Sequence, residues 1–466
     1  MNRREFIILA QGVGLSTWFG DMAFAQSGSV VVRKSATLSS AATDIEVLRK
    51  GVKALRDVTD ATKYASWMYW ANSHCTPDPI PETMKPVWCK CAHSPPLNLN
   101  FLPWHRAYLF FFGALIRELT QTSTFALPYW DWYASKAIPP AFIGDQSNSL
   151  RWTPRGGVNQ TLVKTALRKG KFEEFSSTLE GNPHGSVHVI VGGDMGYIDT
   201  SARDPVFWAH HGNVDRLWSV WLAADNNHTN PTDPAWKTQA FTFDLARQKR
   251  LTVAQMLKTE DLGYKYDNLQ PAGTVDAIPT PPAAVKAASP APNIRAMIAA
   301  QPQALTAPSE ISLAGSLDLA MKIPPLARDR ISAMAAGATG EAPKLALVIQ
   351  GIHVTDAGRR RGFEYRIYVN LPQKPVAEAK HDDFFVGVLN SFQLSHHADS
   401  GTVLIFPIEQ LAPTLNKLGL WNTNEIKVAL ITDDKDAKEP LVRIDNVTLV
   451  TAQTPITPDA VKALSR

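Results

Sequence analysis

The chain has 466 residues, of which 45% are apolar and 19% are charged, and its formal net charge at pH 7 is +4. A chain of this length exceeds one ordinary domain, so we expect two domains with a sizeable core. The small, dispersed charge argues against nucleic acid or an anionic membrane as a partner. No oligomeric state follows from these features.

The first 25 residues have the composition of a targeting segment. Arg3 and Arg4 precede a short apolar run, and Ala23-Phe24-Ala25 fits a cleavage site before Gln26. Adjacent arginines are typical of the twin-arginine route. We therefore expect export to the periplasm or the cell exterior, with an ordinary secretory signal as the alternative. The apolar run is too short to span a bilayer.

Two histidine-rich stretches follow. In the first, a helix over 64–72 leads to His74, and a proline-rich loop then carries His93 and all three cysteines. His105 lies early in a helix over 101–119 that is apolar almost all round, so we expect that helix to be buried.

In the second stretch, His184 and His188 are four residues apart, so a helix over 183–191 would put both imidazoles on one face. A last helix, from 206 to about 224, begins after a proline that suits its first turn and contains His210 and His211. Asp215 repeats the four-residue spacing after His211. We expect Asp215, and Asp131 in the first half, to orient the residues of the site, and the alternative is that both are structural salt-bridge partners.

The pattern changes after this helical part. Residues 268–342 are rich in alanine and proline and are predicted to be a linker. After it, apolar residues alternate, and six strands are expected at 345–349, 363–369, 384–389, 403–406, 426–431 and 442–449. The predicted fold is a mainly α-helical bundle over 26–267, followed by a smaller all-β, sandwich-like domain over 343–466.

The histidines themselves indicate a metal centre. Seven of the twelve fall into the two stretches, and imidazole suits copper, zinc, iron and nickel. A structural zinc favours cysteine, and a catalytic zinc would usually add a nearby glutamate. Six imidazoles without an evident carboxylate ligand fit a pair of copper ions better. Such a pair can give O2 two electrons and take two from an organic reductant.

In and beside the histidine-rich stretches lie three longer motifs, which are Phe101-Leu102-Pro103-Trp104-His105-Arg106, Tyr129-Trp130-Asp131-Trp132, and the run from Asp204 to Arg216. These motifs resemble the copper-binding signatures of the tyrosinase and catechol oxidase family, with the match covering residues 33–266. The resemblance implies that His74, His93 and His105 bind copper A, that His184, His188 and His211 bind copper B, and that His210 is a neighbour that does not bind metal.

The same resemblance bears on the cysteines. Cys91 lies two residues before His93, as in fungal and molluscan members, where a cysteine and a histidine form a thioether. Cys75 follows His74, as in plant members, where that cysteine is in a disulfide. The resemblance thus implies a Cys91–His93 thioether and a Cys75–Cys89 disulfide, and the alternative is three thiols.

Four further residues bear on the reaction. Glu180 matches a glutamate that holds a water near copper B in the family, and Gly185 stands where many tyrosinases have the asparagine that helps to hold it. Ile198 matches the position that gates access over copper A. Phe207 is one helical turn before His211, so it should face the coppers. Gly185 disfavours hydroxylation of monophenols, whereas Ile198 leaves room for substrate.

The function implied by the resemblance is oxidation of catechols to o-quinones with O2 and two copper ions, and hydroxylation of monophenols stays open. Two alternatives share the same ligands: a haemocyanin-like O2-binding protein and an o-aminophenol oxidase. Tyr264-Lys265-Tyr266 and the stretch 362–370 resemble plant polyphenol oxidases. In those enzymes, a C-terminal domain shields the active site, which we expect of residues 343–466.

Overall fold

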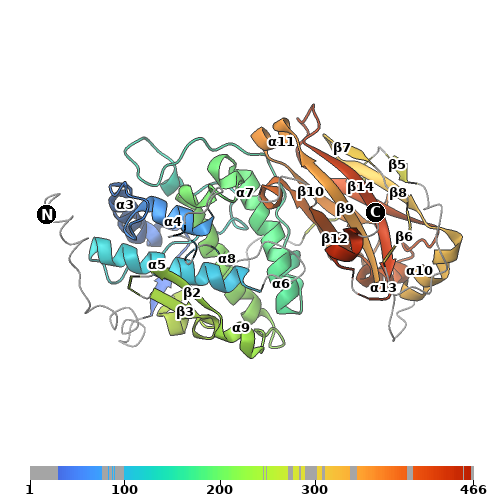
Figure 1. Ribbon diagram of the computed structural model, residues 1–466. Helices are drawn as coiled ribbons and strands as arrows, with labels where there is room; N and C mark the ends of the chain where they lie inside the picture. The colour runs from blue at the N-terminus through green and yellow to red at the C-terminus, as the bar shows by residue number, and fades with distance from the viewer. Residues whose placement is uncertain are drawn as a thin grey trace. The chain divides into compact units, whose positions relative to one another are not determined.

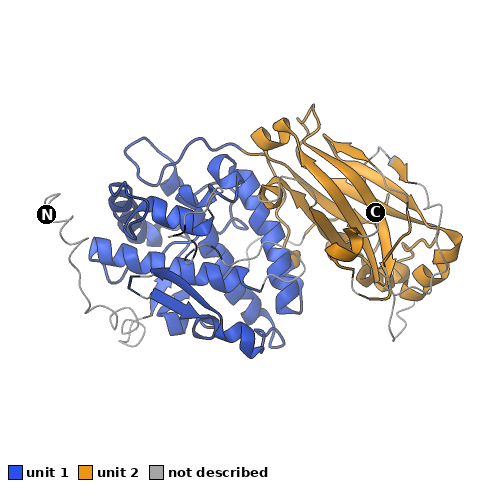
Figure 2. Cartoon of the chain, in the orientation of Figure 1, with its two compact units in different colours: residues 1–156, 166–274 blue, residues 157–165, 275–466 orange. Residues whose placement is uncertain are grey.

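The computed structural model divides the chain into two compact units (Figure 2). Unit 1 comprises residues 1–156 and 166–274, and unit 2 comprises residues 157–165 and 275–466. The structure describes residues 30–75, 82, 85, 87, 89, 99–244, 246–247, 249–270, 276–282, 285–288, 302–306, 310–335, 344–395, 402–454 and 456–462. The predicted targeting segment, residues 1–25, lies outside them.

Unit 1 is mainly helical, as the sequence predicts (Figure 1). Short strands pair at its edges, β1 with β4 in parallel and β2 with β3 in antiparallel orientation. The α-helices are α3 (Ala42–Arg56), α4 (Trp67–His74), α5 (Phe101–Thr120), α6 (Phe172–Leu179), α7 (Ser186–Val191), α8 (Val206–Ala224) and α9 (Pro234–Thr238), and the strands are β1 (Val31–Arg33), β2 (Ala240–Asp244), β3 (Lys249–Thr252) and β4 (Tyr264–Tyr266).

Two helices, α5 and α8, form the centre of unit 1. Every residue of α5 from Phe101 to Ile116 is buried, which confirms the expectation drawn from its apolar sequence. Pro103 is tolerated there because it lies in the first turn, where its missing N–H costs no hydrogen bond. α8 begins after Pro205, as predicted, and the Asp204 carboxylate just before it accepts the Val206 N–H at 2.9 Å.

The helix predicted over 183–191 is divided in two. Residues Glu180–Gly185 form a π-helical turn, η4, in which Asn182 has an extended conformation, and α7 continues from Ser186. The interruption has a local cause, because Pro183 cannot donate the hydrogen bond that a regular helix needs at that point. His184 and His188 nevertheless keep their four-residue spacing across the junction.

Unit 2 is a sandwich of two five-stranded sheets. One sheet has the order β11-β10-β13-β8-β5, and the other has β12-β9-β14-β6 with β7 also paired to β14. All pairs are antiparallel except β5 with β8. The strands are β5 (Val285–Ala288), β6 (Gln303–Ala304), β7 (Ile311–Leu313), β8 (Leu317–Lys322), β9 (Lys344–Val354), β10 (Glu364–Val369), β11 (Phe385–Asn390), β12 (Val403–Pro407), β13 (Glu425–Ile431) and β14 (Val442–Ala452).

All six predicted strands are present in these sheets, and their alternating apolar residues share one core. Leu345, Leu347 and Ile349 of β9 meet residues of both sheets there. Helices α10 (Arg328–Ala335), α11 (Asp356–Arg361), α12 (Ser391–Leu394), α13 (Ala412–Lys417) and α14 (Pro458–Lys462) complete the unit.

The prediction that residues 268–342 form a linker is wrong. This segment contains strands β5 to β8 and helix α10, so most of its described residues belong to unit 2. The composition is misleading because these strands are short and lie between stretches rich in alanine and proline. The alternation is still present in β8, where Leu319 and Met321 point into the core.

One segment of the chain belongs to unit 2 although its neighbours on both sides belong to unit 1. We call residues 157–165 the strap. Val163 is 2% exposed and lies in the core of unit 2. Thr161 Oγ1 donates to Asp433 at 2.6 Å, and Thr165 Oγ1 donates to Asp382 at 2.7 Å. The chain therefore crosses between the two units three times.

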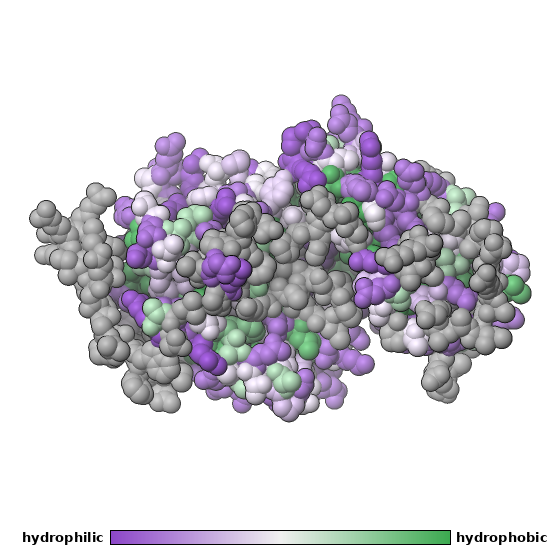
Figure 3. All heavy atoms as spheres, in the orientation of Figure 1, coloured by the Kyte–Doolittle hydropathy of each residue, from purple (hydrophilic) through white to green (hydrophobic). Residues whose placement is uncertain are grey.

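Among the described residues, no helix is both long and apolar enough to cross a bilayer. Large apolar side chains that remain exposed come from separate parts of the chain, such as Leu38, Ile143 and Leu326. On the face drawn in Figure 3, hydrophobic residues are separated by hydrophilic ones.

Candidate metal centre

Six histidines come together in the core of unit 1, all at most 2% exposed. They form two groups that share His211, and within each group one nitrogen per ring lies within 4.8 Å of the others. One group contains His184, His188, His210 and His211, and the other contains His74, His105 and His211. Five of the six predicted copper ligands are thus gathered here, and the sixth, His93, lies outside the described residues.

Helix ends and helix faces position these side chains. α4 ends at His74, and His105 lies in the first turns of α5. His184 lies in η4 and His188 in the first turn of α7, while α8 contributes His211. The rings of His105 and His211 stack at 4.2 Å between centroids, so the two central helices meet at this pair.

Backbone carbonyl groups hold four of the rings. Each has Nδ1 at hydrogen-bond distance from a carbonyl oxygen, which can only accept, so the proton of the neutral ring lies on Nδ1 and the lone pair on Nε2. The tautomer is inferred from these partners. The pairs are His74 with Ile198 (3.2 Å), His105 with Phe101 (2.7 Å), His184 with Glu180 (2.8 Å) and His188 with Met195 (2.8 Å).

The lone pairs converge. Nε2 of His184 and Nε2 of His188 are 3.2 Å apart, and in these tautomers neither can donate to the other. Both ring nitrogens of His211 are buried without a hydrogen-bond partner among the described residues. Such an arrangement is unfavourable in a closed core and becomes favourable when a cation lies among the nitrogens.

Burial also keeps the cluster neutral. It lowers the pKa of His188 and of His211 well below 6.5, and neighbouring imidazoles lower both further. Metal ligands must be unprotonated imidazoles, so this environment favours metal binding at neutral pH.

Aromatic rings surround the imidazoles. Phe207 is fully buried, with its ring 4.2 Å from that of His211 and 4.8 Å from that of His74. Phe101 touches both halves of the cluster, since its ring is 5.0 Å from His105 and 4.8 Å from His184. Sequence reasoning gave Phe101 no role, although its spacing four residues before His105 could have indicated one.

The other predicted site residues lie around the cluster. Glu180 is partly exposed and Gly185 is buried, on either side of His184 in η4. Ile198 is 3% exposed and orients His74 through its carbonyl group. The structure thus places Ile198 on the His74 side of the centre.

The structure differs from the predicted Cys75–Cys89 disulfide. Cys75 is a buried thiol, so its pairing with Cys89 is wrong. Three cysteines allow three pairings, and sequence alone cannot choose between them. Cys91 lies outside the described residues, and the thioether to His93 remains a prediction.

A tryptophan from the segment after α5 reaches the cluster. Trp130 N–H donates to the carbonyl of Ala209 at 2.8 Å, which holds this segment against α8. Gly212 allows the approach, because a Cβ there would lie 3.2 Å from Tyr129. Trp132 Nε1 then donates to Nδ1 of His210 at 3.0 Å. Sequence reasoning missed this contact, which depends on two segments far apart in the chain.

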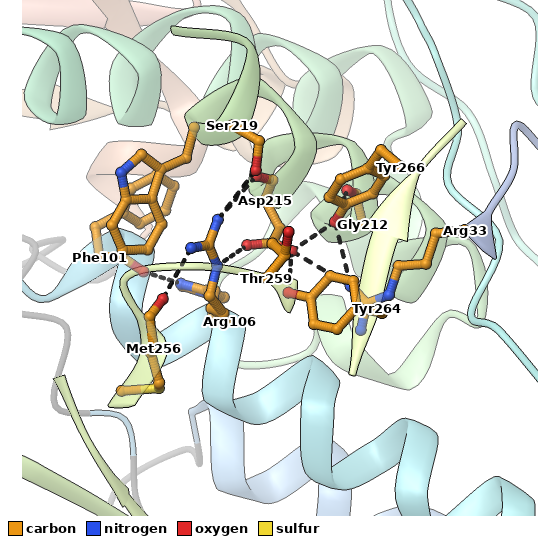
Figure 4. Close-up of polar contacts among 12 residues, drawn as sticks. Arg33, Phe101, Arg106, Gly212, Asp215, Ser219, Met256, Thr259, Tyr264 and Tyr266 are labelled. Atoms are coloured by element: carbon orange, nitrogen blue, oxygen red, sulfur yellow. Dashed lines mark hydrogen bonds and ion pairs between the residues drawn. The ribbon is translucent and has the colours of Figure 1, made fainter. Parts of the chain in front are cut away.

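Asp215 has a different role from its histidine neighbours (Figure 4). Its carboxylate accepts hydrogen bonds from Arg106 (2.5 Å), Tyr264 (2.6 Å) and Tyr266 (2.5 Å), and Arg33 lies at 3.3 Å. Burial would raise the pKa of Asp215, but the two guanidinium groups hold it below its ordinary value. The structure therefore shows the salt-bridge alternative and not the favoured orienting role, since this carboxylate pairs with arginine and tyrosine side chains.

Asp131 also pairs with an arginine. Its carboxylate lies 3.5 Å from Arg216 and accepts the backbone N–H groups of Tyr133 and Ala134. It therefore fixes the turn that carries Trp132, while four of the imidazole rings bond to carbonyl groups instead.

Comparison with known proteins agrees with this geometry. Residues 64–161 and 146–224 match the common central domain of tyrosinase. A tyrosinase of Hahella sp. (strain CCB-MM4) is 27% identical over 84% of this chain and 89% of its own. A chloroplastic polyphenol oxidase of Malus domestica is 31% identical over 36% of this chain and 37% of its own, so that match spans about a third of the plant protein.

A solved structure extends the likeness in fold to both units. The structure of latent apple tyrosinase aligns with 91% of this chain and 98% of its own, with a TM-score of 0.58 and 21% identity. At this identity, the alignment indicates a shared fold.

Proposed function

We propose that the chain is a member of the tyrosinase and polyphenol oxidase family of copper proteins, which the matched central domain and the similar relatives support. We infer from this that it oxidises catechols to o-quinones. Two catechols and one O2 would give two o-quinones and two waters. The cofactor is a pair of copper ions, which supplies the redox chemistry by passing electrons from catechol to O2.

The observation that carries the proposal is the convergence of imidazole lone pairs in the core of unit 1. His184, His188 and His211 would hold one copper, and His74 and His105, with His93, would hold the other. Carbonyl groups orient four of these rings in advance, so little reorganisation is needed on metal binding. All the ligands are neutral, which suits copper in its reduced as well as its oxidised state.

The chain's own residues would bind and orient the phenol. Phe207 and Phe101 give the centre an aromatic wall on which a phenol ring can pack. Glu180 lies beside His184, and we assign its carboxylate the role of accepting the hydroxyl proton of the substrate through a water. Gly185 has no side chain to help hold that water, so we propose that catechol oxidation dominates over monophenol hydroxylation.

The test is a paired assay on copper-loaded protein with a catechol and the corresponding monophenol, following O2 consumption and quinone absorbance. We expect quinone from the catechol and little from the monophenol. Replacing His188 with alanine should abolish turnover. The matched control is His353→Ala, because His353 is exposed on β9 in unit 2. Reversible O2 binding without quinone would contradict the proposal and favour an O2 carrier. Faster turnover of an o-aminophenol would redefine the substrate.

The role assigned to position 185 has its own test. Gly185 has helical angles, φ −59° and ψ −35°, which asparagine can adopt. Gly185→Asn should raise the ratio of monophenol to catechol turnover, whereas Gly185→Ala adds a side chain without the amide and should leave it unchanged. An equal ratio in all three proteins would contradict this role.

We also propose that unit 2 restrains access to the centre, as the C-terminal domain does in the plant enzymes that the sequence resembles. A specific protease site placed within residues 271–275 should make activity rise after cleavage. Full-length protein already as active as the cut protein would contradict the proposal.

Export by the twin-arginine route is proposed from the first 25 residues. Replacing Arg3 and Arg4 with lysine should retain the protein in the cytoplasm, as judged by cell fractionation. Unchanged export would point to the ordinary secretory route.

A further inference from the structure

His210 is the one histidine of the cluster that the proposed copper ligands leave out. It is fully buried in α8, and its ring lies 5.2 Å from that of His184 and 4.7 Å from that of His188. One of its nitrogens is within 4.8 Å of nitrogens of His184, His188 and His211. An imidazole so placed is close enough to act on whatever enters the centre.

Its hydrogen-bond partner determines its tautomer. Trp132 Nε1 is 3.0 Å from Nδ1 of His210, and an indole N–H can only donate. Nδ1 must therefore carry the lone pair, and the proton of this neutral ring lies on Nε2. This is the reverse of the tautomer in the four rings that bond to carbonyl groups.

The reversed tautomer changes what His210 offers. Nε2 is buried and has no hydrogen-bond partner among the described residues. A protonated Nε2 cannot bind a metal ion, but it can donate a hydrogen bond to an anion. A buried N–H without an acceptor is rare in folded proteins, so a ligand or a water that accepts from this group would stabilise the site.

We propose that Trp132 locks His210 as an N–H donor and that His210 binds the small anionic ligands of the metal centre, the class that includes phenolate, hydroxide and azide. Trp132 is then a positioning residue, since it acts only through His210. The proposal rests on the proposed function for the metal pair, and the tautomer lock itself exists without metal.

Two other roles for His210 are possible in chemical terms. If it were a fourth metal ligand, the indole N–H would face a protonated nitrogen or lose its acceptor. If it served only in packing, a phenylalanine would replace it without consequence for ligands. Each role predicts a different outcome for the same set of variants.

The first experiment measures azide binding to the copper(II)-loaded protein by absorption titration, with copper content determined in parallel. His210→Phe keeps a ring but removes the donor, and we expect azide to bind about tenfold more weakly or worse, with copper content unchanged. His210→Gln restores an N–H donor and should recover part of the affinity. Loss of copper in His210→Phe would make His210 a ligand, and unchanged azide affinity would make it a packing residue. Either result would overturn the proposal.

Two matched variants test the hydrogen bond from Trp132 to His210 that locks the tautomer. Trp132 and Trp130 are both buried tryptophans of one segment, but Trp130 Nε1 donates to the Ser135 carbonyl at 2.9 Å. Trp132→Phe should weaken azide binding, whereas Trp130→Phe should not. Equal effects of the two changes would attribute the loss to general disturbance of the segment.

A second measurement does not depend on copper. In metal-free protein labelled with 15N-histidine, the resonance lost in His210→Phe identifies His210. Its Nδ1 shift should be that of an unprotonated nitrogen in the wild type and should change in Trp132→Phe. A protonated Nδ1 in the wild type would overturn the lock even if the protein proved not to be a phenol oxidase.

Discussion

One turn of α8 separates two buried polar sites of opposite character. The first surrounds Asp215, where arginine and tyrosine side chains satisfy both carboxylate oxygens. The second contains His211, whose two nitrogens have no partner among the described residues. Both sites are buried, and both come from long-range contacts.

The difference separates structure from function. A buried group whose partners all come from the chain has nothing left with which to bind a ligand, so the Asp215 network ties β1, α5, α8 and β4 together. A buried group without such partners is stable only if something else provides them. We therefore assign metal binding to the site that contains His211.

The largest test of this contrast is Asp215→Asn. It leaves Arg33 and Arg106 buried without their counter-ion, so we expect a loss of about 3–5 kcal/mol of unfolding free energy. Urea unfolding followed by tryptophan fluorescence reports on unit 1, because twelve of the thirteen tryptophans belong to it.

The matched control is Asp267→Asn. Asp267 is exposed and accepts a hydrogen bond from the Tyr129 hydroxyl at 2.7 Å, so its change should cost about 1 kcal/mol or less. Equal losses in the two variants would show that the Asp215 network is not special to the stability of unit 1.

Acid should affect the histidine site before it affects Asp215. Histidines held neutral in the fold take up no proton near pH 6.5, but they do so in the unfolded chain. Stability of the metal-free protein should thus fall below about pH 6.5, by up to about 1.4 kcal/mol per pH unit for each such histidine.

The Asp215 contribution behaves differently, because its pKa lies below the ordinary value of 3.8. It is present above that pH and disappears only as pH falls through the lowered pKa. Urea midpoints of the metal-free protein at pH 7.5, 6.5 and 5.5 provide the measurement. A midpoint that does not change over this range would contradict neutral burial of the histidines.

His211→Phe should separate stability from metal binding. Because the change removes two buried nitrogens that lack partners, the metal-free protein should keep its stability or gain up to about 1 kcal/mol. Copper content, measured by atomic absorption, should fall.

His228→Phe is the control for that variant. His228 stacks on Trp221 at 4.4 Å and donates to its carbonyl, so the change should lower stability by about 1 kcal/mol and leave copper content intact. The reverse pattern would mean that the histidine cluster is a structural network like that of Asp215.

The smallest effect should come from an exposed ion pair. Lys53 of α3 and Asp57, the residue that follows the helix, lie 3.2 Å apart with both side chains more than half exposed. Lys53→Ala should cost about 0.3–0.5 kcal/mol, which sets a lower reference for the buried network. A loss comparable to that of Asp215→Asn would remove burial as the explanation of the contrast.

Local patterns predicted much of this molecule. The helix over 101–119 and the six strands after residue 343 follow from spacing alone, and the motif resemblance identifies five histidines that the structure brings together. These features are local because each depends on periodicity or on a continuous run of residues.

What sequence reasoning missed depends on contacts between distant segments. Nothing near Trp132 indicates that its indole would reach His210, 78 residues later. The strands over 285–322 were not predicted because the segment is rich in alanine and proline. Composition does not show which other strands a segment pairs with. The Cys75–Cys89 pairing failed for the same reason, since connectivity is a property of the folded chain.

The strap has a consequence for the order of synthesis. A ribosome finishes residues 157–165 before it has made any of the strands among which Val163 is buried. While residues 166–274 emerge and complete unit 1, the Val163 side chain stays exposed to solvent. In a protein truncated after residue 274, Val163 would remain exposed. Deleting the coding sequence for residues 275–466 would therefore also leave part of the remaining chain without its packing partners.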